Sequence, residues 1–281
     1  MNLLSLNSHV AYGYVGNAAA VFALQRLGLE VWPLHTVRLS NHPGHGGFTG
    51  GATSPAALDE LVAGVIARDI PAACGGVVSG YLGAAEQAST VLRAVAAVRG
   101  ARDDAIYVLD PVMGDAGPGL YVDPAIAGAM RDDLLPVADV VTPNAFELGW
   151  LTGRAVTDTQ SGLDAARAVI ARGPRLVAVT SLPVDAVTLG VLGVTADAAW
   201  LIRVPRLAFP VPPNGAGDLL TALIAGRLVR GDGLPGALAA ATNAVNAVLL
   251  ATREAGRREL ALVAAQDALA APPDTLRAAA L

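Results

Sequence analysis

The stretch VPPNGAGDLL, residues 211–220, carries the features from which we infer the fold class and the chemistry of this chain. Three minimal residues, Gly215 to Gly217, precede one acid, Asp218, and a long apolar run that predicts a buried helix. The first turn of a helix offers unpaired backbone N–H groups and partial positive charge. Such a turn suits a phosphate, and an acid beside it is well placed to accept a proton. An ordinary glycine loop with Asp218 favourably placed in a first turn is the alternative explanation.

The composition is typical of a globular α/β protein, and we expect residues 1–281 to form a single domain. Hydrophobic residues make up 53% and charged residues 15%, the net charge is −5, and no basic cluster favours nucleic acid as a partner. The single cysteine, Cys74, favours a reducing, cytoplasmic location, and no stretch resembles a membrane span. All 19 basic residues are arginine, which excludes the Walker P-loop and enzymes with a lysine Schiff base.

Short apolar runs alternate with helical patterns, which predicts repeated strand–helix units and a mostly parallel sheet. We expect strands over 3–7, 30–37, 76–83, 105–110, 138–142 and 175–181, and a hairpin over 186–194 and 197–204. We expect helices over 15–28, 54–69, 85–100, 158–172, 217–230, 234–252 and 257–270, followed by a loose tail.

The segment SHVAYGYVGNAA, residues 8–19, follows the first strand, where open α/β sheets bind ligands. Its GxxG spacing differs from the GxGxxG fingerprint of dinucleotide sites. Ser8 and His9 are candidates for ligand contacts, and the alternative is that Ser8 caps a turn and His9 is structural.

The segment SNHPGHGGFTG, residues 40–50, brings His42 and His45 into one loop. Pro43 and Gly44 disfavour the helix that an HxxH metal site needs, so we interpret the segment as a loop that covers a ligand. In SGYLG, residues 79–83, the Tyr81 ring either stacks on a flat ligand or packs in the core.

Acidic residues follow two further strands. DPVMGD contributes Asp110 and Asp115, which suit Mg²⁺, although Asp110-Pro111 also fits a simple turn. In PNAFELGWL, Asn144 and Glu147 match a helix capping box, and Glu147 is also placed to order a water between metal and phosphate.

Together these segments resemble the pyridoxal kinase family of the ribokinase-like superfamily. SHVAYGYVGNAA, SNHPGHGGFTG, SGYLG, DPVMGD, TPNAFEL and GAGD resemble that family's motifs in order and spacing along nearly the whole chain. GxGD is common to the superfamily, whereas SHV, SNH and SGYLG are typical of the pyridoxal kinase branch. The resemblance implies a three-layer α/β/α sandwich, an ATP co-substrate, Mg²⁺ or another divalent cation, K⁺ as a further candidate ion, and a homodimer.

The resemblance also implies transfer of the ATP γ-phosphoryl group to the 5′-hydroxyl of pyridoxal, with pyridoxine and pyridoxamine as further candidate substrates. Asp218 would be the general base, and Gly215, Ala216 and Gly217 would form the anion hole. The substrate site would comprise Ser8, His42, Pro43, Gly44, Tyr81 and Asp218. The ATP site would comprise Asp110, Thr142, Asn144, Glu147, Thr180, Val204, Pro205, Arg206 and Leu207, and the metal site would comprise Asp110, Asp115 and Glu147.

The substrate loop departs from the family pattern at two positions. Many relatives have Thr where Pro43 stands and a Tyr near His45, which leaves the preferred substrate open. One alternative is a kinase of the same superfamily for hydroxymethylpyrimidine or another small alcohol, although residues 8–30 leave no room for the lid sheet of sugar kinases. A non-catalytic protein that binds vitamin B6 is the other alternative, and it would have no need of Asp218.

Overall fold

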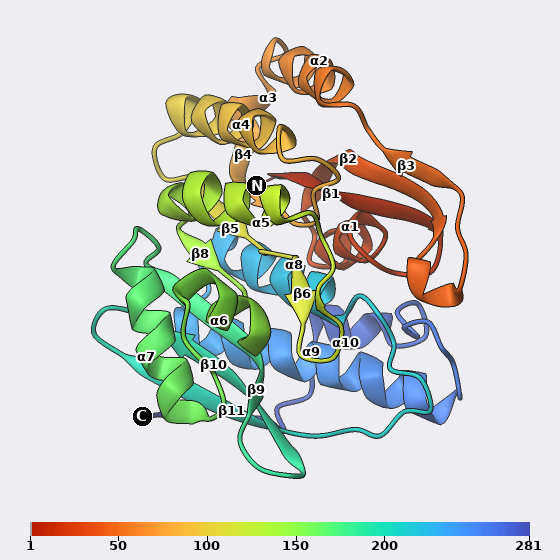
Figure 1. The fold of residues 1–281 in the computed structure, drawn as a ribbon, viewed down its shortest axis with the longest axis vertical. Coiled ribbons are helices and arrows are strands. Elements are labelled where there is room, and N and C mark those ends of the chain that lie inside the picture. The colour runs from red at the N-terminus through yellow and green to blue at the C-terminus, as the bar shows by residue number, and fades with distance from the viewer. Residues whose placement is uncertain (1) are drawn as a thin grey trace.

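The computed structural model describes residues 2–281, and in this range a ten-stranded sheet forms the centre of the molecule (Figure 1). In their order across the sheet, the strands are β12 (Ala279–Ala280), β11 (Ala199–Pro205), β10 (Thr188–Val194), β9 (Leu176–Pro183), β8 (Val140–Val141), β5 (Ile106–Leu109), β4 (Cys74–Ser79), β1 (Asn2–Tyr12), β2 (Glu30–Asn41) and β3 (Gly50–Ala52). The strands from β9 to β2 pair in parallel, and antiparallel strands flank them on both sides. A separate two-stranded sheet consists of β6 (Gly114–Asp115) and β7 (Gly119–Leu120).

Helices cover both faces of the sheet, and each face has its own apolar core. One core lies beneath α2 (Pro55–Ile66), α4 (Gln87–Ala101), α5 (Pro124–Ala129), α6 (Ala145–Thr152) and α7 (Thr159–Ile170). The other lies beneath α1 (Asn17–Arg26), α8 (Ala216–Val229), α9 (Leu234–Glu254) and α10 (Gln266–Ala270). Shorter helical segments are η1 (Pro43–His45), α3 (Ile70–Ala73), η2 (Met130–Leu134) and η3 (Leu135–Val137). The predicted three-layer α/β/α sandwich with a mostly parallel sheet is therefore confirmed.

The carboxyl ends of the parallel strands lie side by side at one edge of the sheet. The backbone N–H groups of Gly80, Asp110, Thr142 and Thr180 each donate to a carbonyl of the neighbouring strand or its extension, at 2.8–3.0 Å. These bonds prolong the sheet by a residue beyond several strands and fix where the following side chains lie. Because the polar segments singled out above follow these strands, the topology gathers them at one edge.

Helix α9 is long and apolar enough to cross a membrane by length and composition alone. It packs against α8, α10, β10 and β11, with residues such as Leu238, Ala241 and Val248 in the core. Burial in the core accounts for its apolar character, because a helix covered by protein on several sides is apolar over most of its surface.

Two expectations near the C-terminal end of the fold are wrong. Residues 257–265 are irregular rather than helical. Gly256, with a φ of +60°, ends α9, and the backbone N–H of Ala261 donates to the Thr252 hydroxyl instead of to a carbonyl one helical turn back. The tail is also held in place rather than loose. The side chain of Asn243 on α9 bonds the backbone of Thr275 and Leu276, and β12 pairs with β11.

Candidate functional site

The stretch 211–218 ends in the first turn of α8. Gly215 is the residue before the helix and has a φ of +91°, a left-handed conformation that favours glycine. A Cβ at this position would clash with the carbonyl of Tyr14, which places the stretch directly against the turn after β1. Gly217 has open space around its Cα, so the helix end is accessible from that side. The geometry matches an anion-binding helix N-terminus.

Asp218 stands in this first turn, and Asn7 on β1 holds its carboxylate. The Asn7 amide donates from Nδ2 to Asp218 Oδ1 at 3.1 Å, and its Oδ1 accepts from the backbone N–H of Tyr81 at 3.0 Å. Burial raises the pKa of Asp218, whereas hydrogen bonds from the Gly16 backbone and from Asn7 lower it. Asn7 is not singled out by the sequence, where its one local signal is a polar residue in an apolar strand immediately before Ser8.

The other carboxylates lie close to Asp218. Asp110 is buried, and burial together with the charges of Glu147 and Asp218 raises its pKa well above the ordinary value. Its Oδ2 accepts from the hydroxyl of Thr221 at 3.0 Å, and that hydroxyl lies 2.8 Å from the Thr142 hydroxyl. Thr221 follows Asp218 by three residues, so both project from the same side of α8. The predicted Asp110 and Thr142 are thus joined to α8 through a residue that the sequence analysis missed.

Glu147 forms the capping box that its spacing indicates. Its Oε2 accepts from the Asn144 backbone N–H at 2.9 Å, and Asn144 Oδ1 accepts from the Glu147 backbone N–H at 2.9 Å. Its Oε1 accepts from the Met113 backbone N–H at 3.0 Å. Burial nevertheless raises the pKa of Glu147 to about 7. Glu147 therefore has a structural task in addition to any catalytic one.

Tyr121, directly after β7, lies near the carboxylates described above. It was not singled out from the sequence. Desolvation and the charges of Glu147, Asp110, Asp218 and Asp115 raise the pKa of its hydroxyl. Asn144 Nδ2 donates to the Gly114 carbonyl at 2.8 Å, and the Tyr121 backbone N–H donates to the Met113 carbonyl at 3.0 Å, so the β6–β7 hairpin lies beside α6.

The residues expected to hold an aromatic substrate approach the same place from β1, β2 and β4. Ser8 lies beside Gly16, where any Cβ would clash with it, and Tyr81 is half-buried after β4. His42 accepts the Gly44 backbone N–H on Nδ1 at 3.1 Å, which indicates that its proton lies on Nε2. A Cβ at Gly44 would be 3.5 Å from Nδ2 of Asn214, so the loop around Pro43 lies against the 211–218 stretch.

Comparisons with known proteins indicate the family to which the chain belongs. The sequence profile of the phosphomethylpyrimidine kinase family matches residues 62–262. The pyridoxal kinase PdxY of Rubrobacter xylanophilus is 47% identical over 97% of this chain and 95% of its own length. The pyridoxal kinase PdxY of Deinococcus radiodurans is 44% identical over 96% and 93%. The chain belongs to the pyridoxal kinase family. The pyridoxal kinase of Leishmania donovani, solved in complex with ADP and pyridoxamine, has the same fold, with a TM-score of 0.93 and 31% identity over 100% of this chain and 99% of that one.

The residues that we expect to bind ATP fall into two groups. Asp110, Thr142, Asn144 and Thr180 lie together at the carboxyl edge of the sheet, where Thr180 forms a bridge with Asn144. Val204 and Pro205 end β11, and Arg206 and Leu207 begin the segment that leads to α8. The second group thus belongs to the antiparallel side of the sheet, and its expected role in nucleotide binding stays a prediction.

A divalent cation fits the chemistry of the carboxylate cluster. The hydrogen-bond donors given above to Asp110 and Glu147 are neutral hydroxyl and backbone groups, so they supply no positive charge to the ionised carboxylates, and a bound cation would supply it. Within residues 2–281, no three His, Cys, Asp or Glu side chains gather closely enough to hold a metal alone. This donor set suits Mg²⁺, which commonly takes one or two carboxylates and completes its shell with phosphate oxygens and water.

Proposed function

We propose that this protein transfers the γ-phosphoryl group of ATP to the 5′-hydroxyl of pyridoxal, producing pyridoxal 5′-phosphate. The observation that carries the proposal is Asp218, a carboxylate fixed by Asn7 at the open N-terminus of α8. The names of the curated relatives and the ligands of the Leishmania donovani enzyme support the choice of reaction and substrate class. Pyridoxine and pyridoxamine are further candidate acceptors.

Asp218 acts as the general base in this proposal. Its raised pKa brings it closer to the working pH, which favours proton transfer from an alcohol in the transition state. Asn7 orients the carboxylate, so that one oxygen is fixed and the other faces the 5′-hydroxyl. The backbone N–H groups of Gly215, Ala216 and Gly217 receive the charge that develops on the transferred group.

The remaining residues bind and orient the two substrates. Ser8, Tyr81 and the loop of His42, Pro43 and Gly44 enclose the pyridine ring. The ATP residues named above hold the nucleotide, with its phosphates toward α8. Carboxylates of the set Asp110, Asp115 and Glu147 would hold Mg²⁺ together with phosphate oxygens and water, and the bound ion would neutralise phosphate charge. K⁺ is a second ion that we expect to assist. We further propose that the chain works as a single domain, in the cytoplasm, as a homodimer.

A hydroxymethylpyrimidine kinase is the second candidate function. The matching family profile is described as phosphomethylpyrimidine kinase, whose pyrimidine substrate is related to hydroxymethylpyrimidine. A Bacteroides thetaiotaomicron structure described as a putative phosphomethylpyrimidine kinase, 26% identical with a TM-score of 0.87, was solved with pyridoxal. Purified protein with Mg-ATP and K⁺ should therefore be offered pyridoxal, hydroxymethylpyrimidine and ribose separately. We expect rapid phosphorylation of pyridoxal alone, and a clear preference for either other alcohol would reject our choice of substrate.

Replacing the base tests the mechanism. Asp218→Asn should lower kcat by about 10²–10⁴-fold and leave the Kd for pyridoxal within about threefold, because the amide keeps the shape and loses the basicity. Asp197→Asn, in the exposed β10–β11 turn, is the matched control and should behave as the unmodified protein. Turnover that survives Asp218→Asn would exclude Asp218 as the base. Pyridoxal binding by an unmodified protein without turnover would favour the non-catalytic B6-binding alternative.

A further inference from the structure

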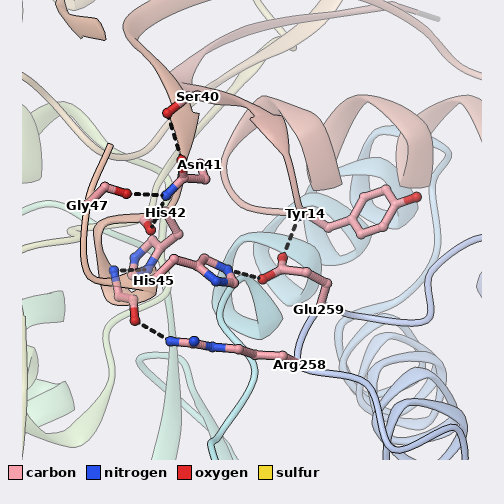
Figure 2. Close-up of polar contacts among 9 residues, drawn as sticks. Tyr14, Ser40, Asn41, His42, His45, Gly47, Arg258 and Glu259 are labelled. Carbon is pink, nitrogen blue, oxygen red and sulfur yellow. Dashed lines mark hydrogen bonds and ion pairs between the residues drawn. The ribbon is translucent and has the colours of Figure 1, made fainter. Parts of the chain in front are cut away.

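The loop from His42 to Gly47, here called the substrate loop, has two sets of polar contacts (Figure 2). The first set is internal and maintains the loop's own shape, with Asn41 Nδ2 donating to the Gly47 carbonyl at 2.6 Å and to the His42 carbonyl at 3.1 Å. The second set reaches across to two consecutive residues, Arg258 and Glu259, that lie more than 200 positions away in the sequence. Most of the loop is exposed, so this second set determines where the loop sits on the protein.

Glu259 is the central contact of the second set. Its Oε1 lies 2.6 Å from Nε2 of His45, and the side chains of Glu259 and His45 are only 5% and 18% exposed. The neighbouring Arg258 donates to the carbonyl of Gly44, and the ring of Tyr12 meets His45 edge-on at 5.6 Å. A hydrogen bond to a carboxylate that is shielded from solvent in this way is stronger and more geometrically defined than one on the surface.

The same carboxylate also holds the turn that follows β1. Its Oε2 accepts from the backbone N–H of Tyr14 at 3.3 Å, and it fills the space that a Cβ at Gly13 would need. This turn continues to Gly16, whose backbone lowers the pKa of Asp218. One side chain therefore connects the substrate loop to the turn that supports the proposed base.

The segment that carries Glu259 is rigid enough to act as an anchor. Leu260, Ala261 and Leu262 are at most 1% exposed, and the Ala261 backbone N–H donates to the Thr252 hydroxyl of α9 at 2.8 Å. A carboxylate projecting from a buried segment keeps its position, whereas the exposed loop opposite has few other contacts to hold it.

We propose that Glu259 is a positioning residue of the substrate site, which fixes the substrate loop through His45 and the 13–16 turn through Tyr14. The inference rests on the proposed function, because that function assigns the loop to the pyridoxal site. Without the contact, the loop would sample open positions and bind the ring less tightly. Catalysis on bound substrate would change little, because Glu259 itself does not contact the reacting groups.

The first test compares Glu259→Gln with Asp267→Asn. Glutamine retains an acceptor for Tyr14 and removes the charge opposite His45, whereas Asp267 forms an exposed ion pair with Arg26 and is the matched control. For Glu259→Gln we expect the KM for pyridoxal to rise about tenfold, with kcat and the KM for ATP within about twofold. Hydrogen exchange of residues 40–48 in the substrate-free protein should quicken by about tenfold or more. Asp267→Asn should change none of these values.

Variants at His45 provide the second test. His45→Ala should reproduce the effect of Glu259→Gln on both the KM for pyridoxal and the loop exchange, and the double variant should be no worse than either single variant. His45→Gln, which keeps an N–H donor for the carboxylate, should recover most of the loss. These variants also test the proposal in the case that Glu259→Gln does not fold.

Unchanged loop exchange in both Glu259→Gln and His45→Ala would overturn the proposal. Faster exchange with an unchanged KM for pyridoxal would also overturn it, since the contact would then be purely structural. The exchange measurement uses no substrate. If this protein phosphorylates a different alcohol, the proposed function is refuted, and the test of Glu259 as a positioning residue remains valid.

Discussion

At the scale of single residues, Asn7 is the side chain whose removal should be most informative. Its amide lowers the pKa of Asp218, and the base must be ionised to accept a proton. Activity is therefore lost as the pH falls through the pKa of Asp218. Asn7→Leu should move this acidic limb of kcat/KM to higher pH and reduce kcat by about 10–100-fold. A pH–rate profile checks this, with Asn246→Leu on α9 as the control, and an unmoved limb would contradict the role of Asn7.

Glu147 should make the stability of the substrate-free protein depend on pH. Burial raises its pKa to about 7, so the folded state binds a proton that the unfolded state releases at lower pH. The free energy of unfolding should consequently decrease between about pH 4.5 and pH 7, by about 1–3 kcal/mol. Glu147→Gln cannot ionise, so it should flatten this decrease. Its single amide oxygen can accept for the capping box and leaves Met113 without an acceptor, which lowers stability at every pH alike. Urea denaturation at several pH values measures the difference, and parallel curves for both proteins would refute the assignment.

At the scale of elements, the sequence predicts the regular parts of the fold well. Strand–helix alternation identifies the central strands, and the capping signals of Asn144 and Glu147 identify the start of α6. The irregular segment 257–265 could not be recognised, because its apolar residues are compatible with a helix and the long-range contacts of Glu259 and Ala261 cannot be read from the sequence. Asn7 and Glu259 were missed for a related reason. Their partners, Asp218 for one and His45 for the other, lie over 200 positions away, and no local pattern reports such contacts.

A substitution at Gly13 tests the role of the turn after β1, and the same substitution at Gly28, after α1, is its control. Both have positive φ values, +101° and +79°, so alanine should cost each about 1–2 kcal/mol of stability from backbone strain. Only at Gly13 would the new Cβ collide with Glu259, whereas Gly28 has no neighbour within 4 Å. We therefore expect Gly13→Ala to raise the KM for pyridoxal as well, and Gly28→Ala to leave it unchanged. Equal KM values for the two variants in steady-state assays would show that the turn after β1 does not affect the substrate loop.

At the scale of the whole molecule, the amino-acid composition determines how the protein reacts with its own substrate and product. Pyridoxal and its phosphate carry an aldehyde that condenses with amines. The 281 residues include no lysine, so no side chain offers the amine that would attack such an aldehyde and form an imine with loss of water. After incubation with pyridoxal 5′-phosphate and reduction with borohydride, peptide mass spectrometry should find no adduct on any side chain. A lysine-containing protein of similar size serves as the control, and reduced side-chain adducts would contradict this expectation.

The contact between Gly13 and the Glu259 carboxylate also limits how this protein can vary. The carboxylate fills the volume of a missing side chain at position 13 and pairs with position 45, so a change at any one of the three alters the fit of the other two. Related sequences should therefore change these positions together, as a set, rather than independently. An engineer who wishes to admit a bulkier alcohol by reshaping the loop around Pro43 would have to redesign positions 13, 45 and 259 in the same step.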